Sequence, residues 1–316
     1  MTKIHAFRLA AVVAAVGLCA SIAAADPLAS EYKSKYNPDI DLEVTAAFDL
    51  PTVGPSASRY KPDIGSFKIG IQSYSFRGHT FEEAVQKTRS FGLKYIEGYP
   101  GQRLSASMPD ASFGPGASPE ALALAKKVLK KNGVKLYNFG VVGLPNNEAE
   151  CRKVFDFAKE MGIQVITSEP EDAAWPIVER LTNEYKIKVA IHNHPKPSHY
   201  YDPLFTRNVL KGLNANIGAC PDVGHWTRSG FDAVKSLTLV NGRIHAVHLK
   251  DLSKTNGGYE DAVLGEGVIN LPGVFEELKR QKFDGVIALE FESGQPDPTA
   301  QVDACIKYLR KLLGGK

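Results

Sequence analysis

The chain alternates strand-like and helix-like segments from Lys68 to its C-terminal end. Strand-like runs are rich in Ile, Val, Tyr or Phe, and each helix-like segment ends at a glycine or a basic turn. Eight such pairs recur at intervals of roughly 25–35 residues, which predicts an α/β fold, a single-domain (β/α)8 TIM barrel. An open doubly wound sheet is the alternative, but Gln72-Ser73-Tyr74-Ser75 stands where that fold has a glycine-rich turn. The first four expected strands are 69–74, 95–97, 135–141 and 165–169.

Residues 1–25 have the features of a secretory signal peptide. A basic start precedes an apolar run over 9–20, and small residues offer a cleavage site after Ala25. This run is shorter than the ~20 residues of a membrane-spanning helix, which disfavours an uncleaved anchor. Residues 26–66 are proline-rich and lack periodicity, so we expect an extended lead-in segment before a barrel domain over 67–316. The prediction is a secreted or periplasmic protein without membrane attachment after cleavage.

The charge balance argues against nucleic acid as a partner. Without Lys3 and Arg8, which lie in the expected signal peptide, the 38 basic residues become 36 and face 35 acidic residues. No basic field remains to hold a phosphate backbone. The cysteines that follow the expected signal peptide are odd in number and widely spaced. Each is therefore expected to fill a gap in the core instead of belonging to a disulfide framework. They are Cys151, Cys220 and Cys305.

Four successive strand-like runs end in acidic or imidazole side chains. The runs are Val189–Pro195, Ile217–Trp226, Ile244–Asp251 and Gly285–Glu292. In a closed barrel all parallel strands end on the same rim, so these side chains are predicted to converge. Carboxylates and imidazoles without thiolates suit one divalent metal ion, such as Mn, Zn, Co, Fe or Mg. The candidate groups at strand ends are Glu169, His192, His194, Asp222, His225, His248 and Glu290.

Five short segments together carry a pattern that is seen in one protein family. They are Ala190–His194, Asp222–His225, His248–Asp251, Leu264–Gly267 and Leu289–Glu290. Together they resemble the sugar phosphate isomerase/epimerase family, the xylose isomerase-like TIM barrels that also include endonuclease IV. Members of that family that are similar to this chain bind one divalent ion through a Glu, an Asp, a His and a Glu at the ends of the last four strands. The resemblance implies Asp222, His248 and Glu290 as metal ligands and His225 as a substrate contact.

The fourth ligand of that family does not carry over. Family members have Glu in a Glu-Asn-His run, whereas this chain has His192 at that position. Either His192 binds the ion itself, or Glu169 reaches in from the preceding strand to restore a carboxylate. We favour Glu169 as the ligand, with His192 or His194 beside it; the alternative is that Glu169 is a capping or solvated acid. The departure also weakens transfer of a mechanism that uses two opposed glutamates.

These residues predict proton transfer next to a carbonyl group. A metal ion would stabilise the negative charge that develops when the neighbouring proton leaves. Glu290 is the expected base, and His192 or His225 would act on the opposite face of the substrate. Lys250 is either an acid partner in the reaction or a lysine paired with the adjacent Asp251.

Two further residues are expected to contact the substrate. Glu97 ends the second strand and is placed to bind sugar hydroxyls, the alternative being a solvent-facing loop acid. Trp226 is expected to stack on a sugar face, although most aromatic residues at such spacing belong to a core.

The predicted function is a metal-dependent sugar isomerase or epimerase. Return of the proton to the other face gives epimerisation, return to the neighbouring carbon gives isomerisation, and loss of a leaving group gives a lyase. Export favours free sugars, keto sugars or glycosides over phosphorylated sugars. The alternatives are a lyase or hydrolase of keto-glycosides and a non-catalytic periplasmic sugar-binding barrel, while near-neutral charge argues against a metal-dependent phosphodiesterase. No sequence feature predicts an oligomeric state.

Overall fold

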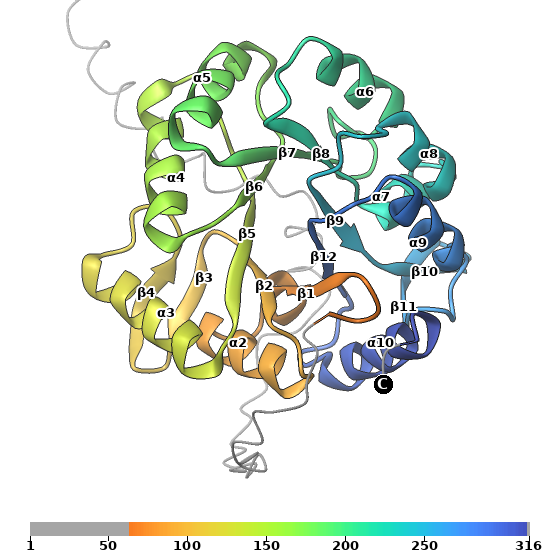
Figure 1. Ribbon diagram of the computed structural model, residues 1–316. Coiled ribbons are helices and arrows are strands. Elements are labelled where there is room, and N and C mark those ends of the chain that lie inside the picture. Colours follow the sequence, from red (N-terminus) through yellow and green to blue (C-terminus); the bar gives the residue numbers. More distant parts are fainter. Residues whose placement is uncertain (1–62, 315–316) are drawn as a thin grey trace, which may run out of the picture. The chain divides into compact units, whose positions relative to one another are not determined.

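Eight parallel strands form a barrel in the computed structural model, which describes residues 63–314 (Figure 1). Neighbouring strands follow the order β8-β7-β6-β5-β2-β1-β12-β9. Bridges from Ala219 to Ile244 and from Asp222 to His248 join β8 to β9 and bring the two sheet edges together. The barrel strands are β1 (Lys68–Gln72), β2 (Tyr95–Gly98), β5 (Lys135–Val142), β6 (Val165–Ser168), β7 (Lys188–His192), β8 (Ile217–Cys220), β9 (Ala246–Leu249) and β12 (Val286–Leu289). The predicted (β/α)8 barrel is confirmed.

The register of the strands brings their carboxyl ends to one level. Leu289 of β12 pairs with Ile71 of β1 and with Leu249 of β9. His192 of β7 pairs with Cys220 of β8. Residues that follow these positions therefore lie on the same rim of the barrel.

Helices surround the strands (Figure 1). Their first turns are capped by side chains: Thr80 forms a capping box with Glu83, and Ser118 accepts from the amide of Ala121 ahead of a helix that begins with Pro119. The α-helices are α2 (Phe81–Ser90), α3 (Pro119–Asn132), α4 (Glu148–Met161), α5 (Trp175–Tyr185), α6 (Pro203–Lys211), α7 (Val223–Arg228), α8 (Ala233–Leu239), α9 (Leu271–Arg280) and α10 (Thr299–Leu312), and two 3-10 helices are η1 (Ser73–Phe76) and η2 (Asp172–Ala174).

The hydrophobic core lies between the strands and the surrounding helices. All residues of β12 are buried, and each such Val, Ile or Leu contributes roughly 1.5–3 kcal/mol of burial free energy. Cys151, Cys220 and Cys305 are buried as well, as predicted. Cys220 belongs to a small apolar cluster with Val165, Ala190 and Ala246.

Two hairpins and one short helix interrupt the predicted alternation. β3 (Gln102–Ser105) pairs with β4 (Met108–Phe113) after β2, and β10 (Asp251–Thr255) pairs with β11 (Gly258–Ala262) after β9. Helix α7 begins directly after Asp222, ahead of the longer helix α8. The hairpin strands are rich in polar residues, so their period-two alternation of apolar side chains is weak.

The barrel packing begins slightly before the first strand. Ile64 and Phe67 are buried and form a bridge with each other. The predicted signal peptide and the cleavage site after Ala25 lie outside the described residues. Within residues 63–314, no helix combines the length and the apolar character needed to span a membrane.

Candidate active site

Four ligand-capable side chains converge at the carboxyl rim. Nε2 of His192 lies 3.8 Å from Oδ2 of Asp222, and Nδ1 of His248 lies 4.0 Å from the same oxygen. Oε2 of Glu290 is 3.3 Å from Nδ1 of His248. All four residues are buried. The structure thus brings together Asp222, His248 and Glu290, and it adds His192 to them.

Backbone contacts fix the Asp222 carboxylate. Its Oδ1 caps α7 by accepting from the amide of His225 at 2.7 Å. Asn193 holds the backbone of Asp222, accepting from its nitrogen at 2.9 Å and donating to its oxygen at 3.0 Å. Oδ2 is buried without a hydrogen-bond partner, although Nζ of Lys250 approaches it to 3.1 Å as an ion pair. One oxygen of Asp222 is therefore left facing the cluster.

A buried carboxylate orients His248. Nε2 of His248 donates to Oε1 of Glu97 at 2.9 Å, and Glu97 also accepts from Thr167 at 2.6 Å and Asn138 at 3.0 Å. This contact assigns a proton to Nε2, so Nδ1 faces the site, where it has no hydrogen-bond partner. Glu97 is 0% exposed. Glu97 is thus not the solvent-facing acid of the alternative interpretation; it orients His248, and its contact with substrate stays a prediction.

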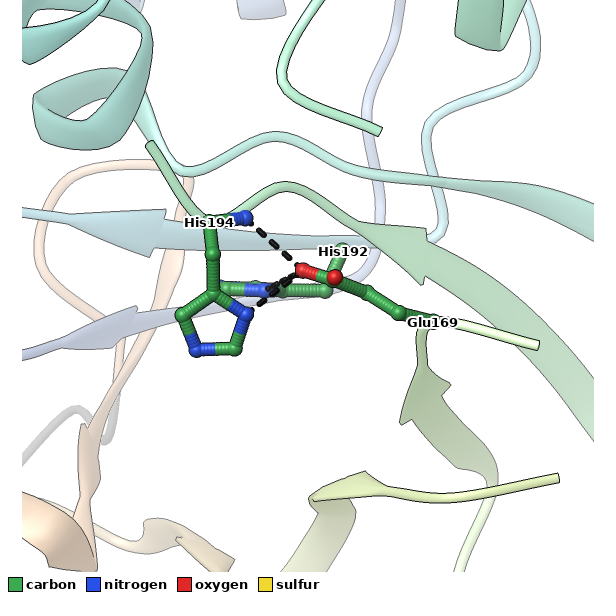
Figure 2. Close-up of side chains that lie close together, drawn as sticks. All are labelled: Glu169, His192 and His194. Atoms are coloured by element: carbon green, nitrogen blue, oxygen red, sulfur yellow. Dashed lines mark hydrogen bonds and ion pairs between the residues drawn. The ribbon is translucent and has the colours of Figure 1, made fainter. Parts of the chain in front are cut away.

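Glu169 holds two histidines through a single oxygen (Figure 2). Oε1 accepts from Nδ1 of His192 at 3.1 Å and from Nδ1 and the backbone nitrogen of His194 at 2.6 and 2.7 Å. Oε2 accepts from Oγ of Ser198 at 2.7 Å. Burial raises the pKa of Glu169, but hydrogen bonds from His192 and His194 outweigh burial and hold this pKa well below its usual range. Both carboxylate oxygens are thus already engaged.

Within residues 63–314, two groups of side chains are close enough to share an ion. One is Glu169, His192 and His194, and the other is His192, Asp222 and His248. The atoms of the first group already bond one another, and His194 is exposed. The second group is buried and contains two atoms that have no hydrogen-bond partner among the described residues, Oδ2 of Asp222 and Nδ1 of His248. The second group therefore fits a metal better, while the ligand roles of Glu169 and His194 stay predictions.

Lys250 lies among three carboxylates. Its Nζ is 3.1 Å from Oδ2 of Asp222, 3.1 Å from Oε2 of Glu290 and 2.5 Å from Oε2 of Glu292. The alternative pairing of Lys250 with Asp251 is wrong, because adjacent residues of an extended chain point to opposite sides. Asp251 instead accepts hydrogen bonds from four backbone amides. They belong to Leu252, Gly265, Gly267 and Ile269.

Gly224 allows Lys250 to reach this position. A Cβ atom at Gly224 would lie 2.3 Å from Cγ of Lys250 and 2.6 Å from its Cδ. A larger residue would displace the lysine from its carboxylates. This contact gives a physical reason for glycine in the Asp-Val-Gly-His run.

Three residues that no motif singled out complete the site. Nη1 of Arg228 donates to Nδ1 of His225 at 3.1 Å and lies 3.3 Å from Oε2 of Glu292. Arg228 also pairs with Asp261 of β11, and Asp261 accepts from the backbone nitrogen of Glu292 at 2.6 Å. Periodicity offered two signals: Arg228 follows His225 by about one helical turn, and Glu292 follows Glu290 by one strand period. Apolar periodicity gave no signal for Asp261, because the strands of its hairpin are rich in polar residues.

His225 and Trp226 have different surroundings on α7. His225 is buried at the site, and this burial lowers its pKa to about 3, so the imidazole is neutral near pH 7. Trp226 is 1% exposed and belongs to the hydrophobic core. Core burial is the alternative that the sequence left open for Trp226, and sugar stacking stays a prediction. Adjacent helical residues point about 100° apart, and here His225 takes the direction toward the site.

The fold and the cluster at its rim define the class of this protein. It is a (β/α)8 barrel whose last four strands, β7, β8, β9 and β12, lead into imidazoles and carboxylates that meet at their carboxyl ends. The chain belongs to the xylose isomerase-like TIM barrel family, whose model matches residues 85–312. The resemblance stated from the sequence is confirmed.

Three comparisons place the chain among its relatives. An uncharacterised protein of Methanocaldococcus jannaschii is 35% identical over 121 residues, 36% of this chain and 40% of that protein. The L-ribulose-5-phosphate 3-epimerase UlaE of Escherichia coli is 26% identical over 169 residues, 48% of this chain and 58% of the epimerase. A crystal structure of an uncharacterised Parabacteroides distasonis protein matches with a TM-score of 0.63 and 33% identity, covering 78% of this chain and 99% of that one. The chain thus spans less than two thirds of the curated relatives named here.

Proposed function

We propose that this protein is a divalent-metal-dependent enzyme that isomerises or epimerises a sugar by moving a proton next to a carbonyl group. The observation that carries the proposal is that two buried atoms without a hydrogen-bond partner among the described residues, Oδ2 of Asp222 and Nδ1 of His248, lie 4.0 Å apart. His192 and Glu290 complete the donor set around them. Family membership and similarity to an L-ribulose-5-phosphate 3-epimerase support the reaction class.

The donor set suits a divalent ion. Two imidazoles and two carboxylates match the preferences of Mn, Fe, Co, Zn or Mg. The far nitrogen of His192 bonds Glu169, and that of His248 bonds Glu97. Such carboxylate partners fix the tautomer of a ligating imidazole and raise its basicity. A bound ion would supply Lewis-acid polarisation of a carbonyl oxygen.

Glu290 is the proposed proton acceptor. Burial raises the pKa of Glu290, but Lys250 and His248 outweigh burial and hold this pKa well below its usual range. The carboxylate is therefore ionised at neutral pH. A base with so low a pKa removes a carbon-bound proton only where that proton is unusually acidic. In this proposal a metal ion would raise the acidity by polarising the neighbouring carbonyl group.

The charges at the rim support an uncharged sugar over a phosphorylated one. Lys250 is surrounded by three carboxylates, and Arg228 is paired with two. Neither Lys250 nor Arg228 is therefore free to bind a phosphate group. Tyr74 and Tyr99 follow β1 and β2 and pack edge to face with ring centroids 5.1 Å apart, and the guanidinium group of Arg77 lies 5.2 Å from the centre of the Tyr74 ring. Export through residues 1–25 would agree with such substrates.

Exchange of the substrate's α-proton with deuterated water tests the proposed function. With a divalent ion and a panel of ketoses, aldoses and keto-glycosides, deuterium should enter next to the carbonyl, and a chelator should stop it. Glu290→Gln should slow exchange at least roughly a hundredfold, whereas Glu276→Gln, an exposed glutamate on α9, should match the wild type. Loss of a leaving group from a keto-glycoside after exchange would identify a lyase. Sugar binding without exchange, with or without metal, would contradict the proposal in favour of a binding protein.

Glu169→Gln should weaken divalent-ion binding by roughly tenfold to a hundredfold while the fold is retained. Glutamine lacks the charge that holds Nδ1 of His192, so the imidazole loses its fixed orientation. Isothermal titration with Mn²⁺ would compare the variant with the wild type and with Glu276→Gln. Complete loss of binding would make Glu169 a ligand, and unchanged affinity would remove it from the site.

A further inference from the structure

The partner of one ring nitrogen distinguishes His225 from the other histidines of the site. His192 and His248 each direct one nitrogen to a glutamate, whereas Nδ1 of His225 lies 3.1 Å from Nη1 of Arg228. A guanidinium group has donors and no acceptor, so Nδ1 of His225 accepts this hydrogen bond and carries no proton. The proton of the neutral ring therefore lies on Nε2.

The protonated nitrogen faces the ligand cluster. Nε2 of His225 is 3.6 Å from Oδ2 of Asp222 and 3.8 Å from Oε2 of Glu292, beyond hydrogen-bond distance of both. The ring is buried and its backbone lies in α7, one turn from the residue that caps that helix. An N–H group held in this way is placed to donate to an oxygen atom of a bound molecule.

Arg228 is itself held from two other segments of the chain. Asp261 of the β10–β11 hairpin pairs with Nη2 of Arg228, and the side chain of Asp261 is 1% exposed. Glu292, which follows β12, lies 3.3 Å from Nη1, and its backbone nitrogen donates to Asp261 at 2.6 Å. Movement of Arg228 away from His225 would take away the cation that pairs with the buried Asp261 carboxylate, which is strongly unfavourable. The guanidinium group is thus fixed against the imidazole.

We propose that Arg228, anchored by Asp261, is a positioning residue that keeps His225 in its Nε2–H tautomer, so that His225 donates a hydrogen bond to a substrate oxygen and does not act as a base. The proposal rests on the proposed function only for the identity of the acceptor. It divides the histidines by their partners. The two backed by glutamates turn their other nitrogen toward the proposed metal site, and the one backed by arginine presents a proton to the cluster.

The tautomer can be read directly from the folded protein. ¹⁵N-histidine-labelled protein in Mg²⁺ or chelator, observed through two-bond ¹H–¹⁵N correlations, should show His225 with its proton on Nε2 and an Nδ1 resonance displaced by an accepted hydrogen bond. Loss of a signal in His225→Gln assigns the resonances. A proton on Nδ1, or protons on both nitrogens, near pH 7 would overturn the proposal.

A paired substitution tests the part played by Arg228. Arg228→Met with Asp261→Asn removes the donor without leaving a buried carboxylate unpaired, and the Nδ1 resonance should return toward its unbonded position. Arg103→Met, an exposed arginine on β3, should leave it unchanged. With an exchanging substrate, the paired variant should lower kcat roughly tenfold to a hundredfold and change KM by less than about threefold. An unchanged Nδ1 resonance or an unchanged kcat would overturn the proposal, whereas a wild type that exchanges no substrate would refute only the proposed function.

Discussion

Lys250→Met should destabilise the metal-free protein by roughly 3–5 kcal/mol, because it removes the shared cation of three neighbouring carboxylates. Nζ of Lys250 lies within 3.1 Å of Asp222, Glu290 and Glu292, and the lysine side chain is 0% exposed. Methionine has a similar length and fills much of the same space, so the loss reports charge more than packing. Urea unfolding of the two proteins at pH 7, in the presence of chelator, measures the difference.

The difference in unfolding free energy between the wild type and Lys250→Met should become smaller as the pH falls. Burial raises the pKa values of Glu290 and Asp222, but nearby cations, Lys250 among them, outweigh burial and depress both. A carboxylate with a depressed pKa stabilises the fold above its unfolded pKa of about 4 and loses this contribution as the pH falls through the folded value. Lys254→Met, an exposed lysine on β10, should change stability by less than about 0.5 kcal/mol. A loss below about 1 kcal/mol for Lys250→Met at pH 7 would contradict this interpretation of the cluster.

Asp222→Asn should lower divalent-ion affinity more than roughly a hundredfold and abolish measurable α-proton exchange. The amide oxygen can still cap α7, so the fold is expected to persist, but the anionic Oδ2 between His192 and His248 is lost. Removing a residue that only orients a ligand costs about tenfold to a hundredfold in affinity, and a ligand itself should cost more.

Asp232→Asn is the matched control for this substitution. Asp232 also caps a helix, accepting from the amide of Lys235 at 2.8 Å at the start of α8. The Asp232→Asn variant should bind Mn²⁺ with wild-type affinity in isothermal titration. If Asp222→Asn retained its affinity for Mn²⁺, the ion would bind at a place that does not involve Asp222.

The fold was largely predictable because the strand and helix periods are strong from Lys68 onward. The two hairpins were not, since polar residues dominate their strands. The turn of β10–β11 does carry a usable signal, because Asn256-Gly257 joins the two strands and this dipeptide favours hairpins. A prediction that weighed turn residues beside apolar periodicity would have placed Asp261 near the rim.

The site was predictable at the level of which strands contribute, because parallel strands share a rim. The sequence did not predict which atoms face one another, because the orientation of each side chain depends on distances of a few ångströms. Glu169 lies next to His192 but turns its oxygens to imidazole N–H groups and a hydroxyl. Adjacent positions also diverge: Lys250 points into the cluster while Asp251 points away, and Trp226 is buried in the core beside His225.

Anomalous diffraction from a crystal of the full chain soaked with Mn²⁺ tests the proposed metal site most directly. One peak at the manganese edge is expected within coordination distance of Nε2 of His192, Oδ2 of Asp222 and Nδ1 of His248, with Glu290 beside it. A peak between Glu169 and His194, or none at saturating Mn²⁺, would contradict the proposal that these side chains share one ion.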